Sequence, residues 1–304
     1  MSELINEFLQ RANQVLQQIE PLLPKPTEAV DWNSVYAASW QRKGNSSFFR
    51  PIQLGADIQL ADLLGVERQR EQLLRNTQQF MQGFPANHAL LWGSRGTGKS
   101  SLVRALLAEY APQGLRLIEV ERNELADLPL IVESLAGLPQ HFIIFCDDLS
   151  FEAGEGDYRI LKSVLDGSLE RAPDNVLLYA TSNRRHLLPE QHSDNQNWQH
   201  GDGGELHPSE AVEDKIALSD RFGLWLSFYP FDQDHYLAVV QHWIAEYAQP
   251  TALKWQFDEG AAKEAISWAS ARGNRNGRCA AQFAKQWVGL RLLEHAADYY
   301  IERL

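Results

Sequence analysis

The sequence contains few of the features that mark secreted or membrane-spanning proteins. It has only two cysteines, Cys146 and Cys279, which favour reduced thiols over a disulfide or a metal site. It has no apolar run of about eighteen residues, so no membrane span is expected. Its first residues lack the basic region and apolar run of a secretory signal. We therefore expect a cytoplasmic protein.

Positive charge is also scarce. The chain has 28 Lys and Arg against 40 Asp and Glu, a formal net charge of −12 at pH 7. Such a chain is not a general binder of nucleic acid or acidic membranes, although a local basic patch is compatible with that charge. Residues 190–214 contain neither Lys nor Arg, and we interpret them as an acidic loop or a small insertion. The spacing of His192, His200 and His207 there fits no compact metal site.

The 304 residues are 44% hydrophobic and 22% charged, typical of a soluble globular protein. Apolar segments alternate with helical patterns, which predicts a parallel sheet with crossover helices. The expected strands are 89–92, 115–120, 142–146, 176–180 and 224–228. After these the pattern is helical only, with helices near 235–247, 259–269 and 278–304.

The first 58 residues are less regular. Residues 3–20 predict an amphipathic helix, which either packs on the body of the protein or docks a partner. Residues 27–58 predict an irregular segment rich in aromatic residues, with basic residues between them. We favour a core under a loop over a surface that stacks nucleic-acid bases.

The most informative stretch is a glycine-rich loop between the first strand and a helix. It matches the phosphate-binding pattern Gly-x-x-x-x-Gly-Lys-Ser. Its glycines allow backbone N–H groups to approach an anion, and the helix that follows presents its positive dipole end. Lys99 provides a charge for the β- and γ-phosphates, and Ser100 a hydroxyl for Mg²⁺. The predicted nucleotide-binding residues here are Gly93, Ser94, Arg95, Gly96, Thr97, Gly98, Lys99, Ser100 and Ser101.

Other polar residues follow the strands. Asp147 ends the apolar strand 142–146 and is our candidate to hold the metal together with Ser100. Asp148 is placed to polarise the attacking water, and Asn183, after strand 176–180, to orient it. We therefore expect Mg²⁺ and ATP as cofactors, with Asp148, Asn183 and Lys99 catalytic.

Two arginines complete the candidate site. Arg221, just before the last strand, is placed to face the nucleotide of a neighbouring subunit and stabilise charge on the transferred phosphoryl group. Arg275 and Arg278 both qualify to reach back over the phosphates from the last helix. We favour Arg278, because it begins that helix.

Together these residues resemble the AAA+ ATPases, from about Leu60 to the end of the chain. Gly93–Ser100 looks like Walker A and Phe142–Asp148 like Walker B, while Asn183, Arg221 and Arg278 resemble sensor 1, the arginine finger and sensor 2. The runs Cys146–Glu152, Thr181–Arg185 and Ser219–Gly223 are similar to those of a bacterial AAA+ group without assigned function.

The resemblance implies an αβα sandwich of the P-loop NTPase type with a five-stranded parallel sheet, then an all-helical lid. The expected domains are an extension at 1–58, a nucleotide domain at 59–230 and a lid at 231–304. It also implies an adenine pocket lined by Leu64 and Gly65, and assembly into a ring, often a hexamer.

Two departures from the family pattern leave several functions open. Asp148 stands where many members have Glu, and the segment after the second strand lacks an aromatic–apolar–Gly pore loop. Our first hypothesis is an ATPase that remodels a protein or nucleic-acid client. The alternatives are a slow nucleotide-dependent switch or loader, and a P-loop kinase of a small molecule.

Overall fold

A twisted, mostly parallel sheet forms the centre of the molecule. The computed structural model describes residues 30–44, 46–53, 58–151, 157–166, 173–185, 218–251 and 253–301, together with 5, 11, 187, 199–200 and 206–207. Seven strands pair in the order β2-β1-β4-β5-β6-β3-β9, and every pair except β1 with β2 is parallel. Their bounds are β1 (Ala37–Lys43), β2 (Ser46–Pro51), β3 (Ala89–Gly93), β4 (Leu115–Glu119), β5 (His141–Cys146), β6 (Val176–Ser182) and β9 (Leu224–Phe228).

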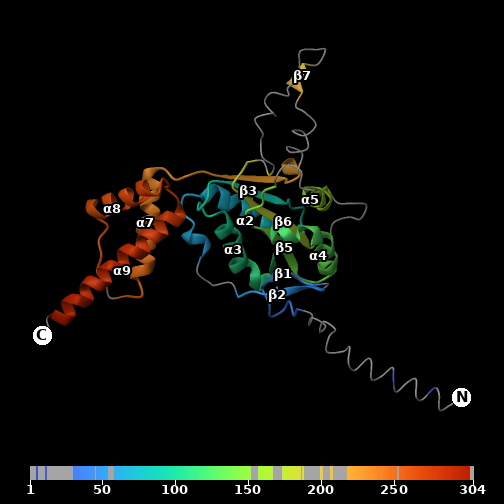
Figure 1. The fold of residues 1–304 in the computed structure, drawn as a ribbon, viewed down its shortest axis with the longest axis horizontal. Coiled ribbons are helices and arrows are strands. Elements are labelled where there is room, and N and C mark those ends of the chain that lie inside the picture. The colour runs from blue at the N-terminus through green and yellow to red at the C-terminus, as the bar shows by residue number, and fades with distance from the viewer. Residues whose placement is uncertain are drawn as a thin grey trace.

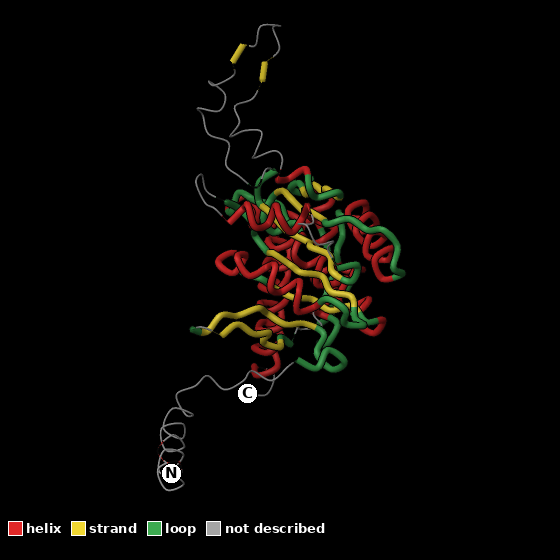
Figure 2. Tube along the Cα trace, turned by 90° about the vertical axis from the view of Figure 1, so that its right-hand side faces the viewer, coloured by secondary structure: helices red, strands yellow, loops and turns green. Residues whose placement is uncertain are grey.

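Helices cover both faces of this sheet, which confirms the predicted αβα sandwich (Figures 1 and 2). One face packs against α2 (Glu67–Met81) and α3 (Lys99–Tyr110), and the other against α4 (Leu128–Leu135) and α5 (Asp157–Asp166). Short 3₁₀ helices complete the layers: η2 (Leu60–Asp62), η3 (Ala111–Gln113) and η4 (Arg122–Asp127). The five strands expected from the sequence are all present.

The prediction of only five strands was wrong, because the segment taken as irregular contributes two more. β1 lies parallel to β4 and turns back into β2. Lys43 pairs with Ser46, so the turn has two residues, and Gly44 has the positive φ of 61° that such a turn needs. Trp32 and Trp40 are buried, and each packs edge-on against Phe49. The interpretation of these aromatic residues as core is therefore confirmed.

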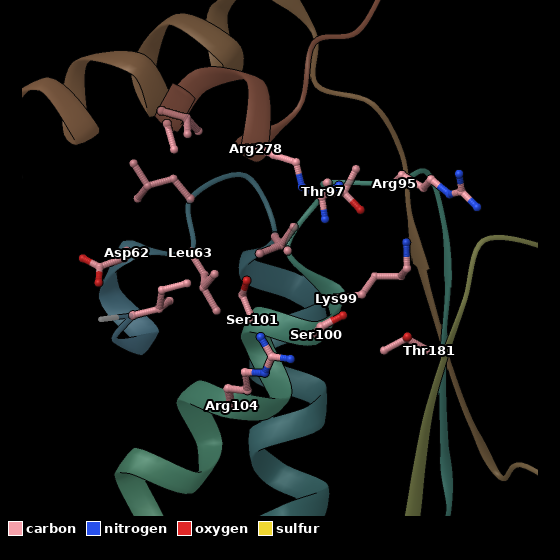
Figure 3. A pocket seen from close by; sticks show the side chains of 18 of the residues that line it. Asp62, Leu63, Arg95, Thr97, Lys99, Ser100, Ser101, Arg104, Thr181 and Arg278 are labelled. Atoms are coloured by element: carbon pink, nitrogen blue, oxygen red, sulfur yellow. The ribbon is translucent and has the colours of Figure 1, made fainter. Parts of the chain in front are cut away.

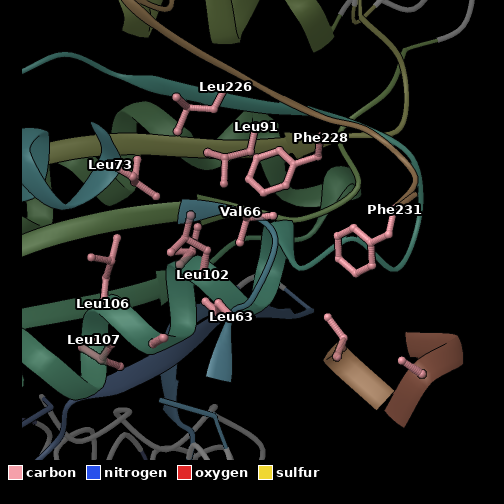
Figure 4. Close-up of a cluster of buried hydrophobic side chains, with 14 of the residues drawn as sticks. Leu63, Val66, Leu73, Leu91, Leu102, Leu106, Leu107, Leu226, Phe228 and Phe231 are labelled. Carbon is pink, nitrogen blue, oxygen red and sulfur yellow. The ribbon is translucent and has the colours of Figure 1, made fainter. Parts of the chain in front are cut away.

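Alternation along the strands produces two apolar layers. In β3, Leu91 faces α2 and α3, whereas Leu90 faces the α4 side. Figure 4 shows the first layer, in which Leu73, Leu102 and Leu106 pack over Leu91 and Leu226. The two layers enclose the sheet and fix the ends of β3, β5 and β6, where the polar residues of the site begin.

A helical lid follows β9 and lies to one side of the sheet (Figure 1). It consists of α7 (Gln233–Ala248), α8 (Glu259–Ala271) and α9 (Gly277–Ile301). Asp232 and Asp258 cap α7 and α8 by accepting hydrogen bonds from backbone N–H groups. Phe231 connects the lid to the apolar layer beneath α3. Among the helices that the structure describes, none is both long and apolar enough to cross a bilayer.

Two sequence predictions fall largely outside the described residues. The helix at 3–20 is described only at Ile5 and Arg11. The acidic segment 190–214 is described only at β7 (Gln199–His200) and β8 (Leu206–His207), which form a separate antiparallel pair. The proposed role of each segment therefore stays a prediction.

Candidate functional site

A cavity of about 690 Å³ lies between the carboxyl ends of the strands and the lid. This is the edge of an open α/β sheet at which ligands bind, and the volume suits a nucleotide-sized molecule. The predicted residues that line it are Leu64, Arg95, Gly96, Thr97, Gly98, Lys99, Ser100, Ser101, Asp147, Asp148, Asn183 and Arg278. Figure 3 shows how the loop, α3 and the lid surround this space.

The loop after β3 has the backbone shape that its glycines predict. Gly93, Gly96 and Gly98 have φ angles of 128°, 75° and 98°, which side chains resist. A Cβ atom at Gly93 would lie 2.0 Å from the carbonyl oxygen of Phe228 in β9. Ser94 N–H donates to that same oxygen at 3.0 Å. The loop is therefore held on β9 and leads directly into α3.

A cluster of hydroxyl and carboxylate oxygens lies at the start of α3. Ser100 Oγ and Thr181 Oγ1 each donate to Oδ1 of Asp147 at 2.6 Å. Mg²⁺ in proteins takes oxygen ligands and favours carboxylates beside phosphates. Ser100 and Asp147 fit such an ion by their chemistry, and Thr181 fixes the carboxylate from β6.

The second carboxylate is held in an unusual backbone conformation. Asp148 has a φ of 52°, and among the described residues it is the non-glycine residue with a positive φ. Its backbone N–H donates to Thr181 Oγ1 at 2.9 Å, and its carboxylate accepts from Asn183 Nδ2. Asp and Asn tolerate this left-handed region better than Glu does. The conformation gives a physical reason for Asp rather than Glu at this position.

Lys99 is the most buried cation of the cavity, with 6% of its surface exposed. Its Nζ donates to the carbonyl oxygens of Gly93 and Ser94 at 2.8 and 2.7 Å, and to Asn183 Oδ1 at 3.4 Å. Burial lowers the pKa of Lys99 to about 8, although Asp147 and Asp148 act in the opposite direction. The amine therefore loses its proton at a lower pH than an exposed lysine does.

This shifted pKa predicts proton uptake on ATP binding. Lys99 is largely neutral at pH 9 in the free protein, and bound phosphates favour its charged form. We expect uptake of about one proton per site at pH 9, little from Lys99 at pH 7, and a fall in affinity as the pH rises above about 8. Calorimetry in two buffers of different ionisation enthalpy measures this.

Lys99→Arg is the matched control, because its guanidinium stays charged at pH 9. It should bind ATP without the extra proton. Equal proton uptake by Lys99→Arg and the wild type would contradict the assignment to Lys99.

The lid contributes a further cation to the cavity. Arg278 lines it from the start of α9 and points toward the loop near Thr97 (Figure 3). Its backbone N–H donates to Gly96 O at 3.1 Å. Arg275 instead contributes its backbone carbonyl, which accepts from Phe231 N–H at 2.9 Å. Of the two arginines that the sequence left open, the structure places Arg278 in the cavity wall.

The end of the cavity away from Lys99 is apolar. Leu64 lines it, whereas Gly65 packs against the Phe231 ring, which would lie 3.3 Å from a Cβ atom at that position. The other apolar lining residues are Ile58, Leu63, Val66, Phe231, Val239, Trp243 and Ala281. Asp62 pairs with His242 of α7 at 3.1 Å beside this end. A flat, apolar base would fit between η2 and the lid.

The charges of the lining favour an anion. Four cationic side chains, Arg95, Lys99, Arg104 and Arg278, face three carboxylates, those of Asp62, Asp147 and Asp148. Arg104, one turn along α3 from Ser100, lies 3.9 Å from Asp147 and 3.8 Å from Glu119. The lining therefore carries one more cationic side chain than carboxylates, on a chain that is strongly acidic as a whole.

Arg221 lies away from this cavity. It comes just before Gly223, which packs against Asn87, and Leu224 N–H donates to His88 O. These contacts place it at the amino ends of β3 and β9, and a five-residue strand is roughly 16 Å long. Arg221 therefore cannot complete the cavity of its own subunit.

Several residues of the site were not predicted from the sequence. Thr181, Arg104, Asn276 and Trp243 all contact the cavity or its loop. Some signals were available: Thr181 is a polar residue at the end of an apolar strand, and Arg104 follows Ser100 at helical i, i+4 spacing. Asn276 precedes a helix, where Asn is a preferred cap. Nothing in the local sequence distinguishes Trp243 from a core tryptophan.

Comparison with protein families gives a match over most of the chain. A family model described as "Protein of unknown function (DUF815)" matches residues 33–291, from the segment before β1 into α9. The chain belongs to this DUF815 family. No curated protein matches it.

Two solved structures are similar to this chain. The Thermotoga maritima RuvB Holliday junction branch migration motor is 17% identical, with a TM-score of 0.47, over 75% of this chain and 63% of that one. Aeropyrum pernix Orc1, in complex with DNA, is 15% identical, with a TM-score of 0.51, over 80% and 65%. The chain thus spans a little under two thirds of both proteins. At this identity the likeness to Orc1 concerns the fold alone.

Proposed function

We propose that this protein binds Mg–ATP in the cavity and hydrolyses it between subunits to remodel a protein or nucleic-acid client. The observation that carries the proposal is the oxygen cluster of Ser100, Asp147 and Thr181 directly beside Lys99. A phosphate chain in the glycine loop would meet Lys99 on one side and a Mg²⁺ ligand set on the other.

In this proposal each residue has one task. Lys99 and the loop N–H groups would bind the phosphates, while Ser100 and Asp147 would hold Mg²⁺, which would neutralise charge on the phosphates. Asp148 accepts a proton from the attacking water, and Asn183 orients it. Arg278 contacts the phosphates from the lid.

Arg221 acts on the nucleotide of the next subunit, which requires self-association, as a ring or hexamer. Its position supports this part of the proposal, because it lies at the edge of the sheet opposite to its own cavity. In GTPases an arginine supplied in this way accelerates turnover on the order of 10³ or more.

A slow switch or loader is the second candidate, and two contacts of Asp148 favour it. The Asp148 carboxylate accepts a hydrogen bond from Asn183 and lies 3.9 Å from Arg95. Both contacts engage that carboxylate within the protein, which leaves it less available to a water molecule. In this case ATP drives assembly, and turnover stays low.

The test is ATP turnover against protein concentration, for the wild type and Arg221→Ala, with size measured in parallel. We expect the specific activity to rise with concentration, and Arg221→Ala to assemble with ATP but to turn over about a thousandfold more slowly. The control is Arg75→Ala, which removes an exposed arginine that pairs with Glu71 on α2. It should match the wild type.

The other outcomes separate the alternatives. Assembly that depends on ATP with low turnover at every concentration supports the switch. Transfer of phosphate to a small acceptor, rather than release as free phosphate, supports a kinase. Activity that is independent of concentration and of Arg221 contradicts a site shared between subunits.

A further inference from the structure

The first residues of α9 are attached directly to the phosphate loop. Asn276 Nδ2 donates to the carbonyl oxygen of Arg95 at 2.9 Å, and Arg278 N–H donates to that of Gly96 at 3.1 Å. These bonds join lid and loop across 181 positions of sequence. They occupy carbonyl groups of the loop and leave its N–H groups for an anion.

Asn276 also caps the helix that it precedes. Its Oδ1 accepts from Cys279 N–H at 2.8 Å, which is the usual geometry of an N-cap. The two polar atoms of one amide thus have different partners. The oxygen caps the first turn of α9, and the nitrogen donates a hydrogen bond to the phosphate loop. The side chain is almost fully buried, at 9% exposure, so each bond is shielded from water.

The packing at this contact is close. A Cβ atom at Gly96 would lie 2.9 Å from the Asn276 amide, and one at Gly277 would lie 3.3 Å from Gly96 O. Glycine at positions 96 and 277 therefore allows the loop and the start of α9 to lie this close together. Two residues after Asn276, Arg278 lines the cavity, so a displacement of the α9 start moves its guanidinium relative to the loop.

We propose that Asn276 is a positioning residue that locks the start of the lid onto the phosphate loop and thereby aims Arg278 at the nucleotide. This inference rests on the proposed ATP site and adds to it a second group through which the lid senses the loop. Its consequence is that loop and α9 start move together, so that a change in the loop on ATP binding is transmitted to the lid.

The test separates the two tasks of the amide. Asn276→Ser keeps a good capping oxygen for Cys279 N–H but lacks the donor to Arg95 O. We expect it to bind ATP about five- to tenfold more weakly, because one buried hydrogen bond is lost. If Asn276 acts by aiming Arg278, the same change in an Arg278→Ala background should cost less than about twofold, since coupled residues are not additive.

A matched control tests whether loss of lid stability explains the effect. Asp258→Ala removes the cap of α8, whose oxygen accepts from Ala261 N–H at 2.8 Å, away from the loop. It should lower the unfolding temperature at least as much as Asn276→Ser and leave the ATP affinity unchanged. A loss of affinity in Asp258→Ala as large as that in Asn276→Ser would overturn the proposal.

The remaining outcomes are equally decisive. Wild-type affinity in Asn276→Ser, or additive effects in the Arg278→Ala background, would overturn the inference while the ATP site stands. Failure of the wild type itself to bind ATP would instead remove the proposed function. The readout is equilibrium binding of a fluorescent ATP analogue to the full chain, with circular dichroism as the check on folding.

Discussion

Lys99→Met should bind ATP about a hundredfold more weakly than the wild type, the largest binding effect that we expect in this chain. Lys99 is buried, and its Nζ lies within 2.8 Å of two loop carbonyl oxygens. Removing it takes away the charge that phosphate would meet. Binding of a fluorescent ATP analogue measures the loss.

The same substitution should have little effect on the free protein. Burial lowers the pKa of Lys99 to about 8, so folding disfavours its charged form, and Met relieves that cost while two carbonyl groups lose a donor. We expect an unfolding temperature within about five degrees of the wild type. This opposition of binding and stability is typical of a residue kept for function.

Lys263→Met is the control for Lys99→Met, because it removes the same charge from an exposed lysine that pairs with Glu259 on α8. Its ATP affinity should equal that of the wild type. If Lys99→Met bound ATP within about threefold of the wild type, the phosphates would not lie in this loop.

Asp148→Asn should reduce turnover about a thousandfold and change ATP affinity less than about threefold. The substitution removes the group that we propose to take a proton from water but keeps the size of the side chain. Asn also accepts the φ of 52° found at this position, so the backbone has no reason to change. Steady-state turnover and equilibrium binding, measured on the same preparation, separate the two effects.

The control for this prediction is Asp234→Asn, in the first turn of α7 and exposed to solvent. It should retain full turnover. Asp148→Glu should not raise turnover above that of the wild type, since Glu is less well tolerated at positive φ. Turnover by Asp148→Asn within about tenfold of the wild type would assign the proton acceptor to another group.

Local sequence predicted the secondary structure well wherever one pattern dominates a segment. The five apolar segments are strands and the helical patterns after β9 are helices, because alternation and helical spacing are properties of neighbouring residues. The hairpin of β1 and β2 was missed. Its signal was the Gly44 turn, but the hairpin joins the sheet only through the pairing of β1 with β4, whose partner residues lie eighty positions away in sequence.

The phosphate loop is the part of the site that the sequence determined by itself. Gly93 to Ser100 are contiguous, and their residue types dictate a strand, a tight loop and a helix start that together form an anion site. The carboxylate at Asp147 followed from the same logic, because it ends a fully buried parallel strand. The residue types within a short segment were sufficient to predict both the loop and this carboxylate.

Only the tertiary structure decided which distant residues complete that site. Thr181 reaches Asp147 because β5 and β6 are neighbours, and Asn276 reaches Arg95 because the lid folds back onto the loop. These contacts depend on strand order and on helix packing, which no local pattern encodes. The position of Arg221 at the far edge of the sheet is likewise a result of the fold, and it is the reason to seek the complete site between two copies of the chain.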